Sequence, residues 1–201
     1  MENIIIEENG IGSTYADIQD KQINIEYFNE SLLNKKYFLI IYEADEDLNK
    51  KEKIGQIEMT YMDIVLAESL DYSIFMLFDM IDDDKQGIYQ YLFDNLEEPN
   101  DQYVGMDTNV LYIDKIYIEK KYRNMGIGKK IVQELPKMVR SILKLRPGCL
   151  VLLANPFEMK EGELVANREK EKIEELIKFY INNGFERIED TQYLVKNMDF
   201  E

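Results

Sequence analysis

The stretch "YRNMGIGKK", Tyr122–Lys130, combines two glycines with a local reversal of charge. The chain has 201 residues with 40 acidic and 24 basic side chains, yet no acidic residue stands between 120 and 130. Five basic residues gather there: Lys120, Lys121, Arg123, Lys129 and Lys130. Glycines let successive backbone NH groups turn into one concavity, and the N-terminus of a following helix adds its dipole. "RNMGIG", Arg123–Gly128, therefore predicts an anion site suited to a pyrophosphate, although a glycine-rich turn with solvated lysines explains the same residues.

The chain has no histidine and a single cysteine, Cys149. This composition excludes a Ser/His/Asp triad, a Cys/His pair, histidine zinc sites and thiolate zinc sites, and no metal is expected. Cys149 stands in the apolar run "GCLVLLA", where a buried thiol is normally inert. Proton transfers are therefore expected from Asp, Glu, Tyr, Lys or the single Cys, directly or through a water relay.

The glycine turn needs a strand before it and a helix after it. Strands are expected at about 22–27, 36–43, 53–62, 109–119, 149–154 and 187–196, where branched and aromatic residues gather. Apolar stripes predict one helix over 129–145 and another over 168–183 that ends at Asn183 and Gly184. This order predicts an α/β (α+β) fold in which a mixed sheet carries helices on its faces.

The segment 63–108 differs from the rest of the chain. "SIFMLFDMI" and "GIYQYLFDNL" predict two short helices around the acidic turn "DDDKQ". Their aromatic residues are suited to wall a cleft: Tyr72, Phe75, Phe78, Tyr89, Tyr91 and Phe93. The acids of this segment, including Asp79 and the run Asp82–Asp84, either favour a cationic ligand or form a solvated turn.

Charge and hydropathy limit the location and the partners. No apolar run approaches the roughly 18 residues that span a bilayer, and the first residues do not resemble a signal peptide, so a cytoplasmic protein is expected. A net charge of −16 disfavours nucleic acid and anionic membranes, and neither is expected as a partner.

Two stretches resemble signatures of the GNAT superfamily of N-acetyltransferases. "DKIYIEKKYRNMGIGKKIV" is similar to the coenzyme A signature, in which a strand leads into Arg/Gln-x-x-Gly-x-Gly/Ala at the start of a long helix. "KFYINNGFERI", from Lys178 to Ile188, is similar to the second signature. The resemblance covers about 109–196 and implies a mostly antiparallel central sheet with helices on both faces and a splayed strand pair that holds CoA.

The resemblance implies one GNAT-like domain over 1–201. Its core, 109–196, is expected to bind CoA, and 1–108 is a variable part with the helical insertion at about 63–108. Acetyl-CoA is the implied cosubstrate. Backbone groups around Ile116–Ile118 are expected on the pantetheine arm, and Asn155 faces its other side or ends a strand. The full set of implied contacts is Ile116, Tyr117, Ile118, Arg123, Asn124, Met125, Gly126, Ile127, Gly128, Lys129 and Asn155.

The resemblance also suggests groups for proton transfer. Tyr180 matches the tyrosine that protonates the leaving thiolate, or packs in its helix. Tyr112 stands where the family often has a glutamate base. Asp114 lies on the same strand face by period-two alternation and is the substitute candidate, unless it is merely solvated.

The sequence thus predicts an acyltransferase that moves an acetyl group from acetyl-CoA to a primary amine of a small molecule or protein by direct attack. The acceptor is expected to be an amine, with a cationic one favoured by the acidic insertion, and the protein to be a monomer or a homodimer. The alternative is a non-catalytic GNAT-fold interaction protein, with or without bound acyl-CoA. The departure at Tyr112 and the aromatic insertion keep this alternative open.

Overall fold

The computed structural model describes residues 3–8, 16–17, 22–23, 26–29, 33–44, 50–160 and 163–199. The strand predicted at 22–27 lies partly outside these ranges, and its described residues belong to two short strands. Residues 45–49, between the strands predicted at 36–43 and 53–62, lie outside the described residues.

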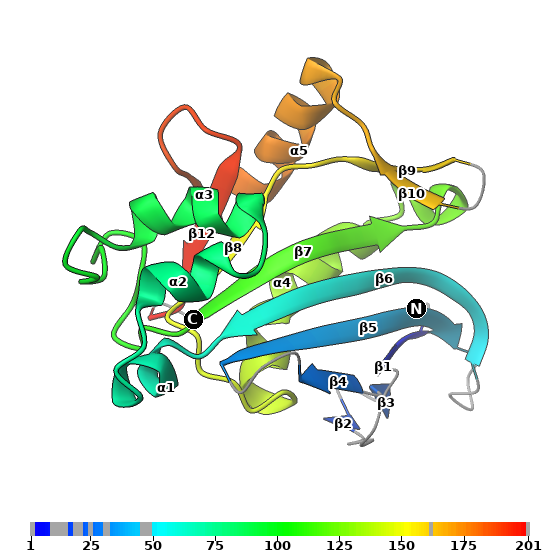
Figure 1. Ribbon diagram of the computed structural model, residues 1–201. Coiled ribbons are helices and arrows are strands. Elements are labelled where there is room, and N and C mark those ends of the chain that lie inside the picture. Colours follow the sequence, from blue (N-terminus) through cyan, green and yellow to red (C-terminus); the bar gives the residue numbers. More distant parts are fainter. Residues whose placement is uncertain are drawn as a thin grey trace.

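The N-terminal part consists of strands followed by three helices (Figure 1). The strands are β1 (Asn3–Glu8), β2 (Ala16–Asp17), β3 (Gln22–Ile23), β4 (Glu26–Asn29), β5 (Asn34–Ala44) and β6 (Lys50–Met62). The helices are α1 (Ile64–Ser69), α2 (Ile74–Asp79) and α3 (Asp83–Leu92). Three helices instead of the predicted two follow β6, because each has its own N-cap side chain, from Asp63, Ser73 and Asp82.

The C-terminal part alternates strands and helices. Its elements are β7 (Val110–Ile118), a 3₁₀ turn η1 (Lys120–Tyr122), α4 (Ile127–Ser141), β8 (Cys149–Leu153), β9 (Phe157–Lys160), β10 (Glu163–Ala166), α5 (Lys170–Ile181), β11 (Glu186–Arg187) and β12 (Tyr193–Asn197). The β9–β10 hairpin was not predicted, since its strands are short. The strand predicted at 187–196 is instead the pair β11 and β12.

The main sheet has the order β11-β12-β8-β7-β6-β5-β1-β3-β2, with β4 also paired to β5. Neighbours are antiparallel except for the parallel pairs β7–β8 and β1–β3. The predicted mixed, mostly antiparallel sheet is therefore confirmed. That the whole chain is one domain stays a prediction.

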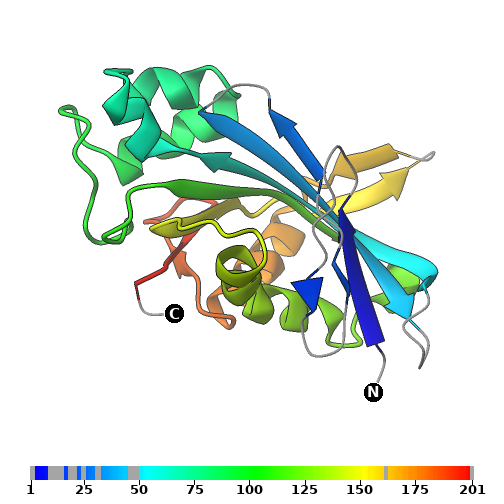
Figure 2. The same cartoon turned by 90° about the horizontal axis from the view of Figure 1, so that it is seen from below.

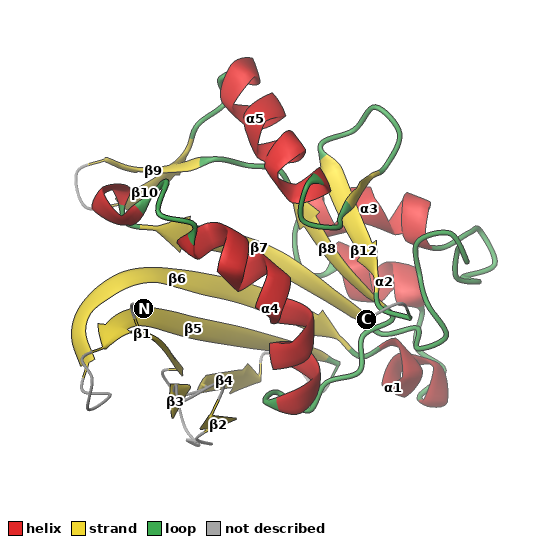
Figure 3. Cartoon of the chain, turned by 180° about the vertical axis from the view of Figure 1, so that it is seen from behind, coloured by secondary structure: helices red, strands yellow, loops and turns green. Residues whose placement is uncertain are grey.

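Side chains alternate between two cores on the two faces of the sheet. Leu111 and Ile113 of β7 pack in the core beneath α4 and α5, whereas Val110 and Tyr112 pack in the core beneath α1, α2 and α3. Figure 2 shows α1–α3 on one side of the sheet and α4 with α5 on the other, and Figure 3 shows α4 lying across the sheet. Helices on both faces are thus confirmed. In the described part of the chain, no helix is long and apolar enough to cross a membrane.

Strand β7 leaves its neighbour β8 halfway along its length. The two strands pair from Val110 with Cys149 to Ile113 with Leu152, and β7 continues to Ile118. On its other side, β7 pairs with β6 through a bulge: Glu58 faces Lys115, Met59 faces Ile113, and Asp114 is the extra residue. The predicted splayed strand pair is confirmed, and Asp114 lies where the splay begins.

Candidate functional site

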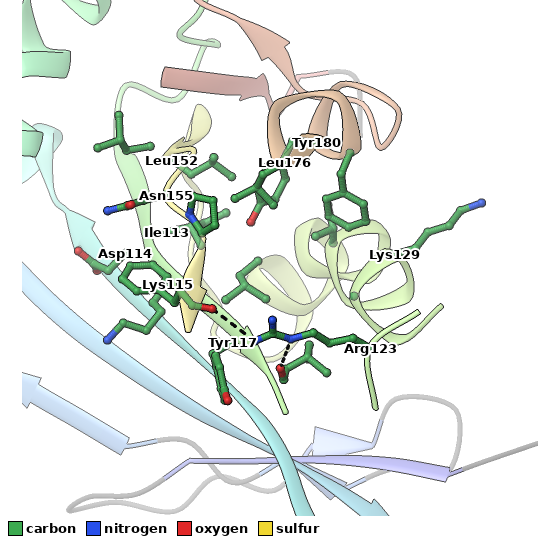
Figure 4. Close-up of a pocket in the computed structure, with 18 of the residues that line it drawn as sticks. Ile113, Asp114, Lys115, Tyr117, Arg123, Lys129, Leu152, Asn155, Leu176 and Tyr180 are labelled. Atoms are coloured by element: carbon green, nitrogen blue, oxygen red, sulfur yellow. Dashed lines mark hydrogen bonds between the residues drawn. The ribbon is translucent and has the colours of Figure 1, made fainter. Parts of the chain in front are cut away.

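A pocket of about 430 Å³ lies at the splay between β7 and β8. Strand β7, the turn before α4, the end of β8, the start of β9 and helix α5 supply its walls. Most of the predicted site residues line it: Asp114, Ile116, Tyr117, Ile118, Arg123, Asn124, Gly126, Gly128, Lys129, Asn155 and Tyr180. Figure 4 shows Asp114 with β7 on one side of the pocket and Tyr180 with α5 on the other.

Three predicted residues do not line this pocket. Tyr112 is buried on the opposite face of the sheet, beneath α3. Ile127 is buried in the core under α4, and the side chain of Met125 is exposed. Backbone groups of Met125 and Ile127 still belong to the turn that forms the pocket's outer end.

The turn before α4 has an unusual backbone. Asn124 has φ 63° and Gly126 has φ 80°, both in the left-handed region. Gly126 is the N-cap of α4 and has no side chain that could satisfy the first NH groups of the helix. A Cβ built on Gly126 would meet no atom within 4 Å. The turn therefore offers open space beside the positive end of a 15-residue helix, an arrangement that suits an anion.

The basic residues around this turn differ in their contacts. Arg123 donates from Nε to the carbonyl of Ile118 at 2.9 Å and from Nη2 to the carbonyl of Phe157 at 3.3 Å, bonds visible in Figure 4. Lys121 donates to Glu52 at 2.5 Å, outside the pocket. Lys129 lines the pocket. The basic cluster of the sequence is thus divided between the pocket and its surroundings.

Phe157, at the start of the β9–β10 hairpin, lines the pocket, and this hairpin was not predicted from the sequence. Lys172 of α5 and the side chain of Asn167 both donate to Glu158, at 2.8 and 2.9 Å. Lys115 Nζ lies 5.3 Å from the ring centroid of Phe157, a cation–π contact across the splay. Two runs of four residues, "FEMK" and "ELVA", were the signal in the sequence, too short to separate a hairpin from a loop.

Tyr180 reaches the pocket from α5. Its side chain is 6% exposed, and its ring packs against the rings of Phe179 and Phe185 with centroid distances of 5.2 and 5.6 Å. Burial raises the pKa of Tyr180 above its ordinary value, because the phenolate would lose its hydration. The hydroxyl of Tyr180 therefore keeps its proton at neutral pH.

Asp114 is held by two side chains from different elements. Its Oδ1 accepts from Lys85 Nζ of α3 at 2.5 Å, and its Oδ2 accepts from the Thr60 hydroxyl of β6 at 2.7 Å. Lys85 also donates to Asp82 at 2.7 Å and lies 4.4 Å from the ring centroid of Tyr112. Sequence reasoning missed Lys85, because it placed this residue in a solvated acidic turn. The N-cap bond from Lys85 N to Asp82 instead starts a helix there.

Cys149 and Tyr112 are buried and lie away from the pocket. Burial raises the pKa of the Cys149 thiol, so that this cysteine is not an available nucleophile. Burial, followed by the negative charge of Asp84, raises the pKa of Tyr112. The tyrosine therefore stays neutral and is a poor proton acceptor.

Comparisons with known proteins give sparse matches. No curated protein sequence matches this chain. A crystal structure of a KacTA–DNA complex matches with 13% sequence identity and a TM-score of 0.43, over 85% of this chain and 72% of that chain. A crystal structure of a KacT mutant, in which a tyrosine is replaced by phenylalanine, matches with 13% identity and a TM-score of 0.42, over 84% and 73% of the two chains.

The prediction that nucleic acid is excluded as a partner is wrong. The first of these structures is a complex with DNA. The physical error was to judge a surface by the net charge of −16, which is a sum over the chain. The basic residues between 120 and 130 show that the local charge can have the opposite sign.

A protein-family model also matches the sequence. The model of the acetyltransferase (GNAT) family matches residues 47–148, half of the chain. The matched region includes β6, β7, the glycine turn and α4, and it ends at Gly148, just before β8. The chain therefore belongs to the GNAT acetyltransferase family.

Proposed function

We propose that this protein transfers an acetyl group from acetyl-CoA to a primary amine by direct attack. One observation carries the proposal: a single pocket extends from the left-handed glycine turn at the N-terminus of α4 to Asp114 at the splay, with Tyr180 in its wall. The pocket thereby joins an anion site, the edge of β7 that β8 leaves unpaired and a buried proton donor. We call the part of the pocket along this edge the slot.

The pocket fits the chemistry of a coenzyme A thioester. Open space beside Gly126 and the positive end of α4 suit a pyrophosphate, with Lys129 nearby. Beyond Ile113, β7 has no β8 partner, so its edge toward the splay is suited to bond the amides of an extended arm. When bound there, acetyl-CoA supplies the acetyl group as a reactive thioester.

Arg123 has a role in shaping this slot. Its guanidinium joins the end of β7 to the start of β9 and lies 5.4 Å from the ring centroid of Tyr117. The carbonyl of Ile118 is occupied by this bond, and Ile116 is therefore the preferred backbone partner of a pantetheine amide. We assign Arg123 to holding the end of β7 and the start of β9 together beside the slot.

Two protons must move during the transfer. A primary amine has a pKa of about 10, so its ammonium form first gives one proton to water, and the free amine then attacks the thioester carbonyl. The C–N bond forms as the C–S bond breaks. Tyr180 is the proposed donor to the departing thiolate, and the second proton of the amine returns through water to Tyr180. Asp114 has an oxygen bonded to Lys85 and the other bonded to Thr60, so its remaining lone pairs are suited to accept a hydrogen bond from the acceptor amine. We assign Asp114 to orienting the amine.

A second candidate function is a binding protein without turnover. The inserted helices and the loop after them expose apolar side chains, including Met80 at 62% and Leu96 at 81%. Exposed apolar residues of this kind mark partner surfaces in other proteins. This observation favours an interaction role for the insertion, and it is compatible with catalysis in the pocket.

The test begins with calorimetric titration of acetyl-CoA into the full chain, with ATP and NAD as controls. Selective binding of acetyl-CoA is expected, followed by release of free thiol when a library of primary amines is added. Binding without thiol release from any amine would replace the enzyme by the binding protein. A folded protein that binds none of the three ligands would overturn the acetyltransferase and leave the interaction protein as the remaining candidate.

A further inference from the structure

Lys85 is a buried cation at the junction of the inserted helices and the pocket. It is the only basic residue between 63 and 108, and it is 2% exposed. Its side chain leaves the first turn of α3 and bridges Asp82 of the same helix and Asp114 of β7. A lysine is rarely buried so completely unless it is paired, and here both carboxylates lie within hydrogen-bond distance.

We infer that Lys85 is a positioning residue for the acceptor end of the pocket, because it fixes the carboxylate of Asp114 that faces the incoming amine. The inference rests on the proposed acetyl transfer. Helix α3, which belongs to the insertion at about 63–108, then determines the position of the Asp114 carboxylate at the splay.

The backbone around Asp114 explains why this carboxylate needs fixing. Asp114 is the extra residue of the β6–β7 bulge, so no ladder partner on β6 aligns it. On the other side, the β7–β8 pairing has already ended at Ile113. The side chain is 26% exposed and is held by Lys85 and Thr60 from two other elements. Removing either bond frees a carboxylate on a locally irregular strand.

The charges around Lys85 keep it ionised. Asp82 and Asp84 face it from α3, Asp114 and Tyr112 from β7, and Tyr193 of β12 donates to the carbonyl of Asp84. Burial by itself would lower the pKa of Lys85, but the charge and hydrogen bonds of Asp114, then those of Asp82, raise it overall. The group that positions Asp114 is therefore a permanent cation at neutral pH.

Asp114 is the more exposed partner of this pair. Without Lys85, the carboxylate of Asp114 would lose its counterion and one of the two hydrogen bonds that hold it. A change at Lys85 should therefore appear in the KM for the amine, whereas acetyl-CoA binds at the other end of the pocket.

The chain offers a matched control pair. Lys35 of β5 lies 3.7 Å from Asp63, the N-cap of α1, and 5.9 Å from the ring centroid of Tyr61. This pair also joins the sheet to the insertion through a lysine, a carboxylate and a tyrosine ring, but neither residue lines the pocket. Lys35→Met therefore removes a similar contact without reaching Asp114.

The experiment compares wild type, Lys85→Met, Lys85→Arg and Lys35→Met with acetyl-CoA and the best amine of the library. For Lys85→Met we expect a rise of at least about tenfold in KM for the amine, since small misplacements near reacting atoms are costly. The kcat should change less than the KM for the amine, and the Kd for acetyl-CoA should stay within about twofold of wild type. Lys85→Arg should recover part of the loss, and Lys35→Met should behave as wild type.

Thr60→Val provides a second route if Lys85→Met does not fold. It removes the other bond to Asp114 without changing a charge, and a higher KM for the amine is expected. Unchanged amine kinetics in all folded variants, beside an active wild type, would overturn the positioning role and leave the acetyltransferase standing. A wild type that uses no amine would overturn the proposed function, and the role of Lys85 with it.

Discussion

The two ends of the pocket differ in the groups that form them, which are backbone groups at one end and side chains at the other. The outer end, at Arg123–Lys129, is made by backbone: two residues with positive φ, a glycine N-cap and the start of α4. The inner end, at the splay, depends on side chains: Asp114 lines the pocket there and is held by Thr60 and Lys85 from two other elements. One end is local in sequence, and the other is assembled by the fold.

This difference determines how amino-acid substitutions at each end should affect binding, turnover and stability. A backbone cradle depends on φ angles that glycine adopts easily, so most side-chain changes around it should be mild and changes at Gly126 severe. A side-chain cluster depends on every member, because removing one partner leaves another unpaired in a partly buried place. The outer end should therefore govern acetyl-CoA affinity, and the inner end amine use and stability.

The largest expected effect separates turnover from binding. Tyr180→Phe keeps the buried ring and removes the hydroxyl, and kcat should fall by about 10²- to 10⁴-fold, the usual contribution of a general acid. The Kd for acetyl-CoA should not change. Since burial raises the pKa of Tyr180, wild-type activity should show no loss from tyrosine ionisation below about pH 10. Stopped-flow thiol release and calorimetry measure the two quantities.

Tyr103→Phe is the matched control for this change. Tyr103 is also buried, and burial likewise raises its pKa, but it lies outside the pocket. Its removal should leave kcat unchanged. Equal turnover by Tyr180→Phe and wild type would show that Tyr180 only packs against Phe179 and Phe185.

The next effect concerns the outer end. Gly126→Glu places a carboxylate in the open space of the turn, where repulsion of a pyrophosphate should cost several kcal/mol and weaken acetyl-CoA binding by at least about 100-fold. Gly126→Ala meets no atom within 4 Å, so it should cost only about 1 to 2 kcal/mol of folding stability for its positive φ. Calorimetry and urea denaturation measure the two effects.

Gly184→Ala tests whether backbone strain explains the loss. Gly184 also has positive φ, at the end of α5 and outside the pocket. It should lower stability like Gly126→Ala and leave the acetyl-CoA affinity intact. Tight acetyl-CoA binding by a folded Gly126→Glu variant would place the anion elsewhere.

The contrast between the ends also explains what the sequence could predict. The outer end was predicted because "RNMGIG" carries its geometry in adjacent residues. The strand before it and the helix after it were predicted from periodicity, although α4 begins at Ile127 and ends at Ser141 rather than spanning 129–145. The final turn was predicted too: Gly184 has φ 88° directly after α5.

Only one part of the inner end, Asp114, could be predicted from the sequence. Period-two alternation identified Asp114, but its partner Lys85 lies 29 positions earlier, in a segment interpreted as a solvated turn. No local pattern distinguishes a lysine that will be buried by tertiary packing from one that stays in solvent. The bulge that isolates Asp114 is equally a property of the β6–β7 pairing and not of either strand.

A smaller effect tests the stability of the inner end. Lys85→Met leaves Asp114 and Asp82 without their cation. Breaking a buried pair costs about 3 to 5 kcal/mol, and the partial exposure of both carboxylates should reduce the loss to about 2 kcal/mol in urea denaturation. Lys35→Met should cost less than about 1 kcal/mol, because both members of its pair are more exposed than Lys85.

The pH dependence of this loss has a definite sign. Folding raises the pKa of Lys85, so its contribution is complete below the unfolded-state pKa of about 10.4 and is lost as the pH rises through the folded-state value. The difference between wild type and Lys85→Met should therefore be constant from pH 7 to 9 and shrink above about pH 10.5. A difference that already vanishes at pH 8 would mean that Lys85 is neutral in the folded protein.

The smallest expected effect is a difference in acetyl-CoA affinity between substitutions at two basic residues, Lys129 and Lys121. Lys129 lines the pocket, whereas Lys121 is paired with Glu52 away from it. Lys129→Ala should weaken acetyl-CoA binding by about 3- to 5-fold at low salt, the scale of one exposed charge, and the loss should fade as salt is added. Lys121→Ala should stay within about twofold of wild type. Equal losses from both variants would mean that the turn attracts the anion through its summed charge, and the outer end would then be less purely a backbone site than its geometry indicates.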